Sequence, residues 1–216
     1  MKPLPQPSTV FIFAAENSKI TELNANVDSY MNFNGNYAYD AISLFDNARI
    51  DLISGGEYKT YYTDGYIQSW LESNPKSVKE LISYTVALNG EGVSIGKISG
   101  GTFLSVMDKA NNGTPIHVNS GKVELISGGY FGFVKKGLTE PGAMLFANTA
   151  NGGAIEKITG GTFEKGTWKG YGCAFENIVA DSGCQAIETG ETVDVAIQFS
   201  TKVTTYTLKV FEVVAK

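Results

Sequence analysis

The sequence holds little positive charge, and little charge of any kind. Only 18% of its 216 residues are charged, Arg49 is the single arginine, and the formal net charge is −5. Binding a nucleic-acid backbone requires a clustered basic surface, which this composition does not provide. We therefore predict no nucleic-acid partner.

Long apolar runs and the features of a secretory signal are also missing. No stretch approaches the roughly 18 uninterrupted apolar residues of a transmembrane helix, so we expect no membrane partner. Pro3, Pro5 and Pro7 interrupt the place where a signal peptide would have its apolar helix. One interpretation is a mature form that restarts with Met1. The simpler interpretation is a protein kept without export, whose residues 1–8 form an extended Pro-rich docking arm.

Cysteine and histidine are nearly absent. Cys173 and Cys184 are too few for a disulfide scaffold; one local bridge stays open, but two reduced, buried thiols are favoured. His117 is the single histidine, so neither a Ser-His-Asp triad nor a His-based zinc site has more than one to use. His117 itself is expected to be an ordinary strand residue. We predict no metal and no cofactor.

Glycine, in contrast, is abundant, and much of it belongs to a repeat. It accounts for 25 of 216 residues, well above the usual share of roughly 7%. Four segments, at 50–58, 95–103, 123–131 and 155–163, share the pattern Ile/Val-x-x-Ile-Ser/Thr-Gly-Gly-x-Phe/Tyr. The motif isoleucines Ile53, Ile98, Ile126 and Ile158 are 45, 28 and 32 residues apart. Loops of variable length therefore interrupt a constant scaffold.

Each copy of the motif follows another apolar stretch, at 41–45, 84–88, 115–118 and 143–147. Their alternation argues against a two-helix repeat, which needs a period of 3.6, and the shortest unit barely accommodates a four-stranded propeller blade. The Gly-Gly step suits a sharp corner that a Cβ atom would block. We predict an all-β fold, a right-handed parallel β-helix with about three short strands per rung and about five to six rungs.

The two ends differ from the middle. Residues 9–27 indicate a degenerate first rung, and 173–175 with 186–190 indicate a weaker fifth copy of the repeat. Residues 193–199 and 206–210 alternate on both sides of 200–202, which predicts a β-hairpin. The expected organisation is an arm at 1–8, a β-helix at 9–190 and a hairpin at 191–216. This hairpin would cap the last rung and join copies of the chain, with a homotrimer favoured.

Runs of Ile-Ser-Gly-Gly-Thr-Phe, as at 98–103, resemble the repeats of pectate-lyase-like β-helices in bacterial and phage surface proteins. The resemblance covers about residues 41–190 and implies the fold above all, because this architecture hosts lyases, hydrolases, adhesins and virion spikes. A lyase of this type would hold Ca²⁺ with several carboxylates beside a basic residue. The rungs show no such cluster of Asp, and Arg49 stands alone.

The variable segments are the candidates for binding. They fall at 59–83, 104–114, 132–142 and 164–172 and should emerge along one edge, the longest with a short helix at 74–82. Their aromatic residues are candidates for contacting a glycan or a protein; they are Tyr61, Tyr62, Tyr66, Trp70, Trp168 and Tyr171. An equally favoured alternative is that these side chains cover the helix as a local mini-core.

Two acidic residues occupy matching motif positions in successive repeats, Glu124 and Glu156. Stacked rungs would place them about 4.8 Å apart, close to the carboxyl spacing of a retaining glycosidase. Asp51 occupies the same motif position in the first repeat, and Gly96 occupies it in the second. Because lysines share the same strands, we favour a solvated outer face with cross-strand ion pairs. We expect no catalytic residue, and Glu124 and Glu156 are the acids to test if the protein is an enzyme.

Three functional classes remain: a phage virion protein such as a fibre, spike or decoration protein, a bacterial adhesin module, and a polysaccharide lyase or glycoside hydrolase. The missing export signal favours a virion protein made in the host cytoplasm over an adhesin at the cell surface. The missing catalytic constellation argues against an enzyme. We predict a non-enzymatic virion protein that binds copies of itself, other virion or surface proteins through residues 1–8, and a glycan as a candidate ligand.

Overall fold

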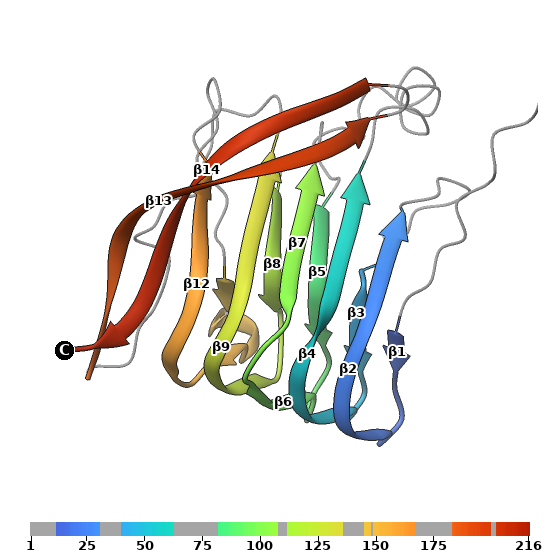
Figure 1. Cartoon of the computed structure of the whole chain (residues 1–216). Helices are drawn as coiled ribbons and strands as arrows, with labels where there is room; N and C mark the ends of the chain where they lie inside the picture. The colour runs from blue at the N-terminus through green and yellow to red at the C-terminus, as the bar shows by residue number, and fades with distance from the viewer. Residues whose placement is uncertain are drawn as a thin grey trace, which may run out of the picture.

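The computed structural model describes residues 12–30, 40–62, 82–107, 112–135, 145–147, 149–166, 183–199 and 202–216. They form two β-sheets, A and B, and in Figure 1 sheet B lies in front of sheet A. Sheet A has the order β1-β3-β5-β8-β10. Its strands are β1 (Ile12–Ala14), β3 (Ile42–Phe45), β5 (Ile82–Asn89), β8 (Asn112–Val118) and β10 (Leu145–Ala147).

Sheet B has the order β13-β14-β12-β9-β6-β4-β2, with β7 and β11 beside this path. Its first strands are β2 (Lys19–Tyr30), β4 (Arg49–Tyr62), β6 (Ser94–Ile98), β7 (Thr102–Met107) and β9 (Lys122–Lys135). They are followed by β11 (Ala154–Ile155), β12 (Ile158–Gly166), β13 (Cys184–Phe199) and β14 (Lys202–Ala215). The short 3₁₀ helix η2 (Thr149–Asn151) precedes β11.

One strand of sheet A, a tight turn and the following strands of sheet B make one coil. Parallel pairing stacks coil 1 (β1, β2), coil 2 (β3, β4), coil 3 (β5–β7), coil 4 (β8, β9) and coil 5 (β10–β12). In Figure 1 the near strands point up and the far strands point down while the chain advances from right to left, a right-handed path. The predicted right-handed parallel β-helix, including its degenerate first rung, is confirmed.

The Gly-Gly step bends sheet B at the corner of each repeat. A Cβ atom added at Gly100 or Gly128 would collide with the carbonyl oxygen of Ser54 or Ser99 in the preceding coil. In β4 and β9 the chain passes the corner as one strand of 14 residues, instead of the two short strands we expected there. The ladder continues because glycine lets the backbones approach without a side chain between them.

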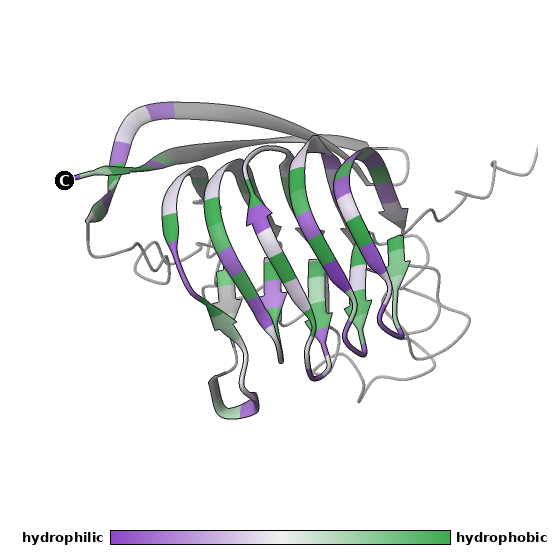
Figure 2. Ribbon diagram, turned by 90° about the horizontal axis from the view of Figure 1, so that it is seen from below, coloured by the Kyte–Doolittle hydropathy of each residue, from purple (hydrophilic) through white to green (hydrophobic). Residues whose placement is uncertain are grey.

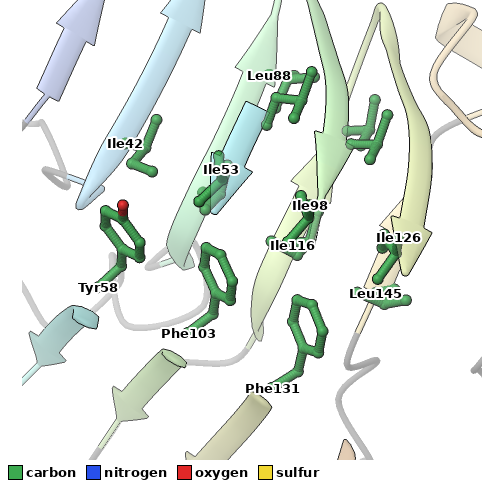
Figure 3. Packing of buried hydrophobic residues seen from close by; sticks show 14 of the residues in the cluster. Ile42, Ile53, Tyr58, Leu88, Ile98, Phe103, Ile116, Ile126, Phe131 and Leu145 are labelled. Carbon is green, nitrogen blue, oxygen red and sulfur yellow. The ribbon is translucent and has the colours of Figure 1, made fainter. Parts of the chain in front are cut away.

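The core consists of matching columns of side chains from successive coils (Figure 3). All four motif isoleucines are buried, with 1% of their surface exposed at most. The motif aromatics stack from coil to coil, with centroid distances of 5.1 Å for Tyr58–Phe103, 5.1 Å for Phe103–Phe131 and 4.9 Å for Phe131–Phe163. Both predicted inward columns are therefore confirmed. Figure 2 shows apolar and polar residues alternating along the strands of sheet B.

A C-terminal hairpin caps the last coil. Strand β14 runs antiparallel to β12 and places Phe211 opposite Phe163, and the side chains of Phe211 and Val213 are buried. The hairpin is longer than expected, because β13 already begins at Cys184. Residues 186–190 were predicted as the second strand of a fifth repeat; instead they belong to β13, in which 186–188 pair antiparallel with β14. They lack the Gly-Gly-x-aromatic corner that would turn them into another coil.

Several expectations fall outside this description. Residues 1–8, Cys173 and residues 74–81 of the helix predicted at 74–82 lie outside the described residues; Ile82, predicted as the last helical residue, instead begins β5. Cys184 has a free, buried thiol. Within the described part of the chain, no helix is long and apolar enough to span a membrane.

Candidate functional site

The variable segments leave the coils along a single edge, here called the loop edge. Strands β4, β7 and β9 end at Tyr62, Met107 and Lys135, which are paired in register. The strands of sheet A begin at the same edge, where Ile82 pairs with Asn112. The segments 63–81, 108–111, 136–144 and 167–182 therefore all start from this edge, as expected, although the strands extend further than the sequence indicated.

The predicted aromatic binding residues lie in this region of the chain. Tyr61 and Tyr62 belong to β4 and not to an insertion, because their backbone continues the ladder opposite Val106 and Met107. Tyr66, Trp70, Trp168 and Tyr171 lie outside the described residues. Their role in contacting a glycan or a protein stays a prediction.

The outer face of sheet B carries a network of ion pairs centred on Arg49. Its guanidinium group lies 2.6 Å from Asp51 in the same strand and 3.0 Å from Glu124, two coils away. Gly96 of coil 3 lies between them, and a Cβ atom there would be 2.8 Å from the Arg49 Nη2 atom. The missing side chain at Gly96 thus gives the guanidinium its path across coil 3.

Lys122 continues the network toward coil 5. Its ammonium nitrogen lies 3.3 Å from Glu124 and 3.2 Å from Glu156, while Lys19 lies 2.8 Å from Asp51. The predicted cross-strand ion pairs are present. The hydrogen bond from Arg49 lowers the pKa of Glu124, whereas a general acid needs a raised pKa. Among the described residues, no cluster of acidic, histidine or cysteine side chains is suited to hold a metal.

A second group of polar side chains lies on sheet A, where Asp40 and His117 are buried and Tyr84 is half-buried. Asp40 is 8% exposed, and its carboxylate accepts hydrogen bonds from the Ser43 hydroxyl, at 2.9 Å, and from the backbone N–H of Tyr84. The Tyr84 ring stacks on His117, with 3.8 Å between centroids and 5° between planes. Burial raises the pKa of Asp40 to about 7 and lowers that of His117 to about 4.

From the sequence, His117 was expected to be an ordinary strand residue, and the repeat motif pointed to neither Asp40 nor Tyr84. A signal was present, since Asp40 and Tyr84 each stand two residues before a strand position, Ile42 and Val86, that the ladder pairs in register. Equal offsets from paired residues place Asp40 beside Tyr84. We refer to Asp40, Tyr84 and His117 as the buried polar cluster.

No protein-family model, curated protein or solved structure matches this chain. The functional proposal below therefore rests on the residues of the chain itself.

Proposed function

We propose that this chain is a non-enzymatic display scaffold, a structural and receptor-binding component of a phage virion. The observation that carries the proposal is the loop edge. A constant stack of coils brings the ends of β4, β7 and β9 into register, so segments of variable length and sequence leave side by side. Binding residues are often placed on loops that a rigid scaffold positions.

The network on the outer face of sheet B supports a non-catalytic role for the acids there. Glu124 and Glu156 share Lys122, and Arg49 holds Glu124 from the other side. These contacts keep the Glu124 carboxylate ionised, which suits an ion pair and not proton donation to a leaving group.

The hairpin supports assembly with other copies. Beyond its contact with β12, residues 192–199 of β13 and 202–207 of β14 pair with each other and with no other described strand. An isolated two-stranded ribbon is at best marginally stable in water, so partner copies would stabilise it, with a trimer favoured. Residues 1–8 would connect the assembly to other virion proteins.

The binding role is tested by replacing the longest segment, 63–81, with a Gly-Ser linker. Purified full-length protein and this variant are labelled and incubated with cell envelopes of candidate host bacteria. We expect binding to be lost at an unchanged unfolding temperature. The control is Glu156→Gln, which removes one charge from the ion-pair network on the outer face of sheet B and should bind normally. Undiminished binding by the loop variant would refute display by the longest loop.

The enzymatic alternative has a separate test. We expect incubation with acidic polysaccharides to release no new reducing or unsaturated ends, because Glu124 and Glu156 are ion-paired. Release that disappears in Glu124→Gln or Glu156→Gln would instead establish a polysaccharide lyase or glycoside hydrolase.

A further inference from the structure

The buried polar cluster links coils 2, 3 and 4, and two of its members, Asp40 and Tyr84, lie close to the loop edge. Asp40 is the first described residue after 31–39 and lies two residues before β3, Tyr84 lies near the start of β5, and His117 is the penultimate residue of β8. Strands β5 and β8 thus contribute one member each, and the segment before β3 contributes the third. A change at Asp40 therefore acts beside Tyr84, close to where the segment 63–81 rejoins the scaffold at Ile82.

The groups around Asp40 offer hydrogen bonds but no positive charge. Ser43 of β3 and the backbone of Tyr84 donate to its carboxylate, and His117 of β8 lies behind the Tyr84 ring. Strand β1 has no titratable residue, and from β4 the Thr60 hydroxyl donates to the Tyr84 carbonyl oxygen at 3.1 Å. Within the described ranges, no lysine or arginine forms an ion pair with Asp40.

A buried carboxyl group without a cation is more stable as the neutral acid. When its proton passes to solvent, the remaining carboxylate is best stabilised by water, which reaches it only if the surrounding strands separate locally. We propose that the buried polar cluster is a proton-controlled latch: it holds the loop edge closed while Asp40 is protonated and lets this edge open locally when Asp40 ionises.

The direction of the effect follows from proton linkage. The closed state keeps the Asp40 pKa at about 7, whereas a hydrated carboxyl group returns to its ordinary value of 3.8. Between these values the closed state binds more protons than the open state, so raising the pH favours opening. The open population then increases by up to about tenfold per pH unit in this range.

The latch is a property of the fold and is measured without any ligand. Only its consequence, altered presentation of the loops to a receptor, rests on the proposed function. Failure of the binding experiment above would therefore leave the latch intact, and failure of the latch would leave loop display intact.

The test is native-state hydrogen exchange of the full chain at several pH values between about 5 and 7, with rates corrected for intrinsic exchange. We expect the protection of the Tyr84 amide to fall by up to about tenfold per pH unit. The Ile126 amide, which donates to the Lys157 carbonyl oxygen in sheet B, should show constant protection.

Two variants separate the members of the cluster. Asp40→Asn cannot ionise, so its Tyr84 protection should be independent of pH. The proposed local opening hydrates Asp40 and leaves His117 packed in β8, so His117→Gln should retain the pH dependence. If Asp40→Asn does not fold, the titration of the Asp40 side-chain carboxyl carbon, followed by NMR in the unmodified protein, replaces it, with an expected midpoint near 7.

Four results at the cluster itself would overturn the latch. These are constant Tyr84 protection in the unmodified chain, an equal fall in Asp40→Asn, loss of the fall in His117→Gln, and a midpoint of Asp40 near its ordinary value. An equal fall at Ile126 would also overturn it, since Asp40 would then control unfolding of the whole stack and not the loop edge.

Discussion

At the scale of single residues, the long-range ion pair of Arg49 depends on a glycine in the coil that it crosses. Arg49 reaches Glu124 because Gly96 leaves room over coil 3. The repeat motif shows that Gly96 stands where Asp51, Glu124 and Glu156 stand in the other repeats, but the contact of Arg49 requires the register of three coils to be known together. A motif that describes one coil at a time contains no such information.

This arrangement predicts that Gly96→Ala destabilises the protein. The new Cβ atom would lie 2.7 Å from the Asp51 carbonyl oxygen and 2.8 Å from Arg49 Nη2, so both must shift. Chemical denaturation of Gly96→Ala, Arg49→Ala and the double variant measures the effect. We expect Gly96→Ala to lower the free energy of unfolding less in the Arg49→Ala background, because one of the two collisions is gone. Strictly additive effects would contradict the proposed crossing.

A second residue-scale prediction concerns pH. The Asp40 pKa is raised from 3.8 to about 7, so its contribution to stability is lost as the pH rises through this range. The His117 pKa is lowered from 6.5 to about 4, so its contribution is lost as the pH falls through this range. Between about 4 and 6.5 the two effects oppose each other, and stability should vary little.

Removing either titratable group should reveal the pH dependence of stability that the other group produces. Denaturation at several pH values should show that Asp40→Asn becomes more stable as the pH rises from about 4 to 6.5. His117→Gln should become less stable over the same interval. Parallel pH profiles for the two variants would show that the opposing titrations do not exist.

At the scale of structural elements, the repeat motif was sufficient to predict the coils. Ile126 and Phe131 could be placed in the core because their counterparts recur at the same motif positions, and stacking requires like residues to meet. The hairpin boundary was predicted less well, because residues 186–190 have strand-forming composition that suits either a coil or a hairpin. Pairing with β14, distant in sequence, decides between them.

Stacking in the centre of the helix makes Ile126 a sensitive position. It lies between Ile98 and Ile158 and is fully buried, so Ile126→Ala should lower the free energy of unfolding by about 2–5 kcal/mol. Ile187→Ala is the matched control, because the Ile187 side chain in β13 is 40% exposed. Its effect should stay within about 0.5–1 kcal/mol. Similar losses at both positions would argue against a continuous core column.

At the scale of the whole molecule, the two ends of the stack are built differently. In coil 1, Asn24 and Ala25 stand opposite Gly55 and Gly56, and no described coil precedes them whose backbone would collide with a Cβ atom. The Tyr58 hydroxyl donates to the Gly55 carbonyl oxygen at 3.0 Å and accepts from the Ala25 N–H at 3.3 Å. The other end is closed by the antiparallel hairpin instead.

The proposed assembly predicts that the distal hairpin, and not its base, joins copies of the chain. Because Thr192 pairs with Lys209, residues 193–208 can be replaced by an Asn-Gly turn that leaves the base on β12 in place. Light scattering should give a trimeric mass for the full chain and a monomeric mass for this variant. A monomeric full chain, or a variant of unchanged mass, would exclude assembly through the distal hairpin.

The direction of the ladder hydrogen bonds has a mechanical consequence. Parallel pairing between successive coils makes these bonds run along the axis of the stack. A force applied along that axis therefore loads the layers in series, each carrying the full tension, and the weakest layer separates first. Pulling the chain by its ends in a force spectrometer should then release one coil after another as a sawtooth, whereas a sideways load would be shared by all coils together.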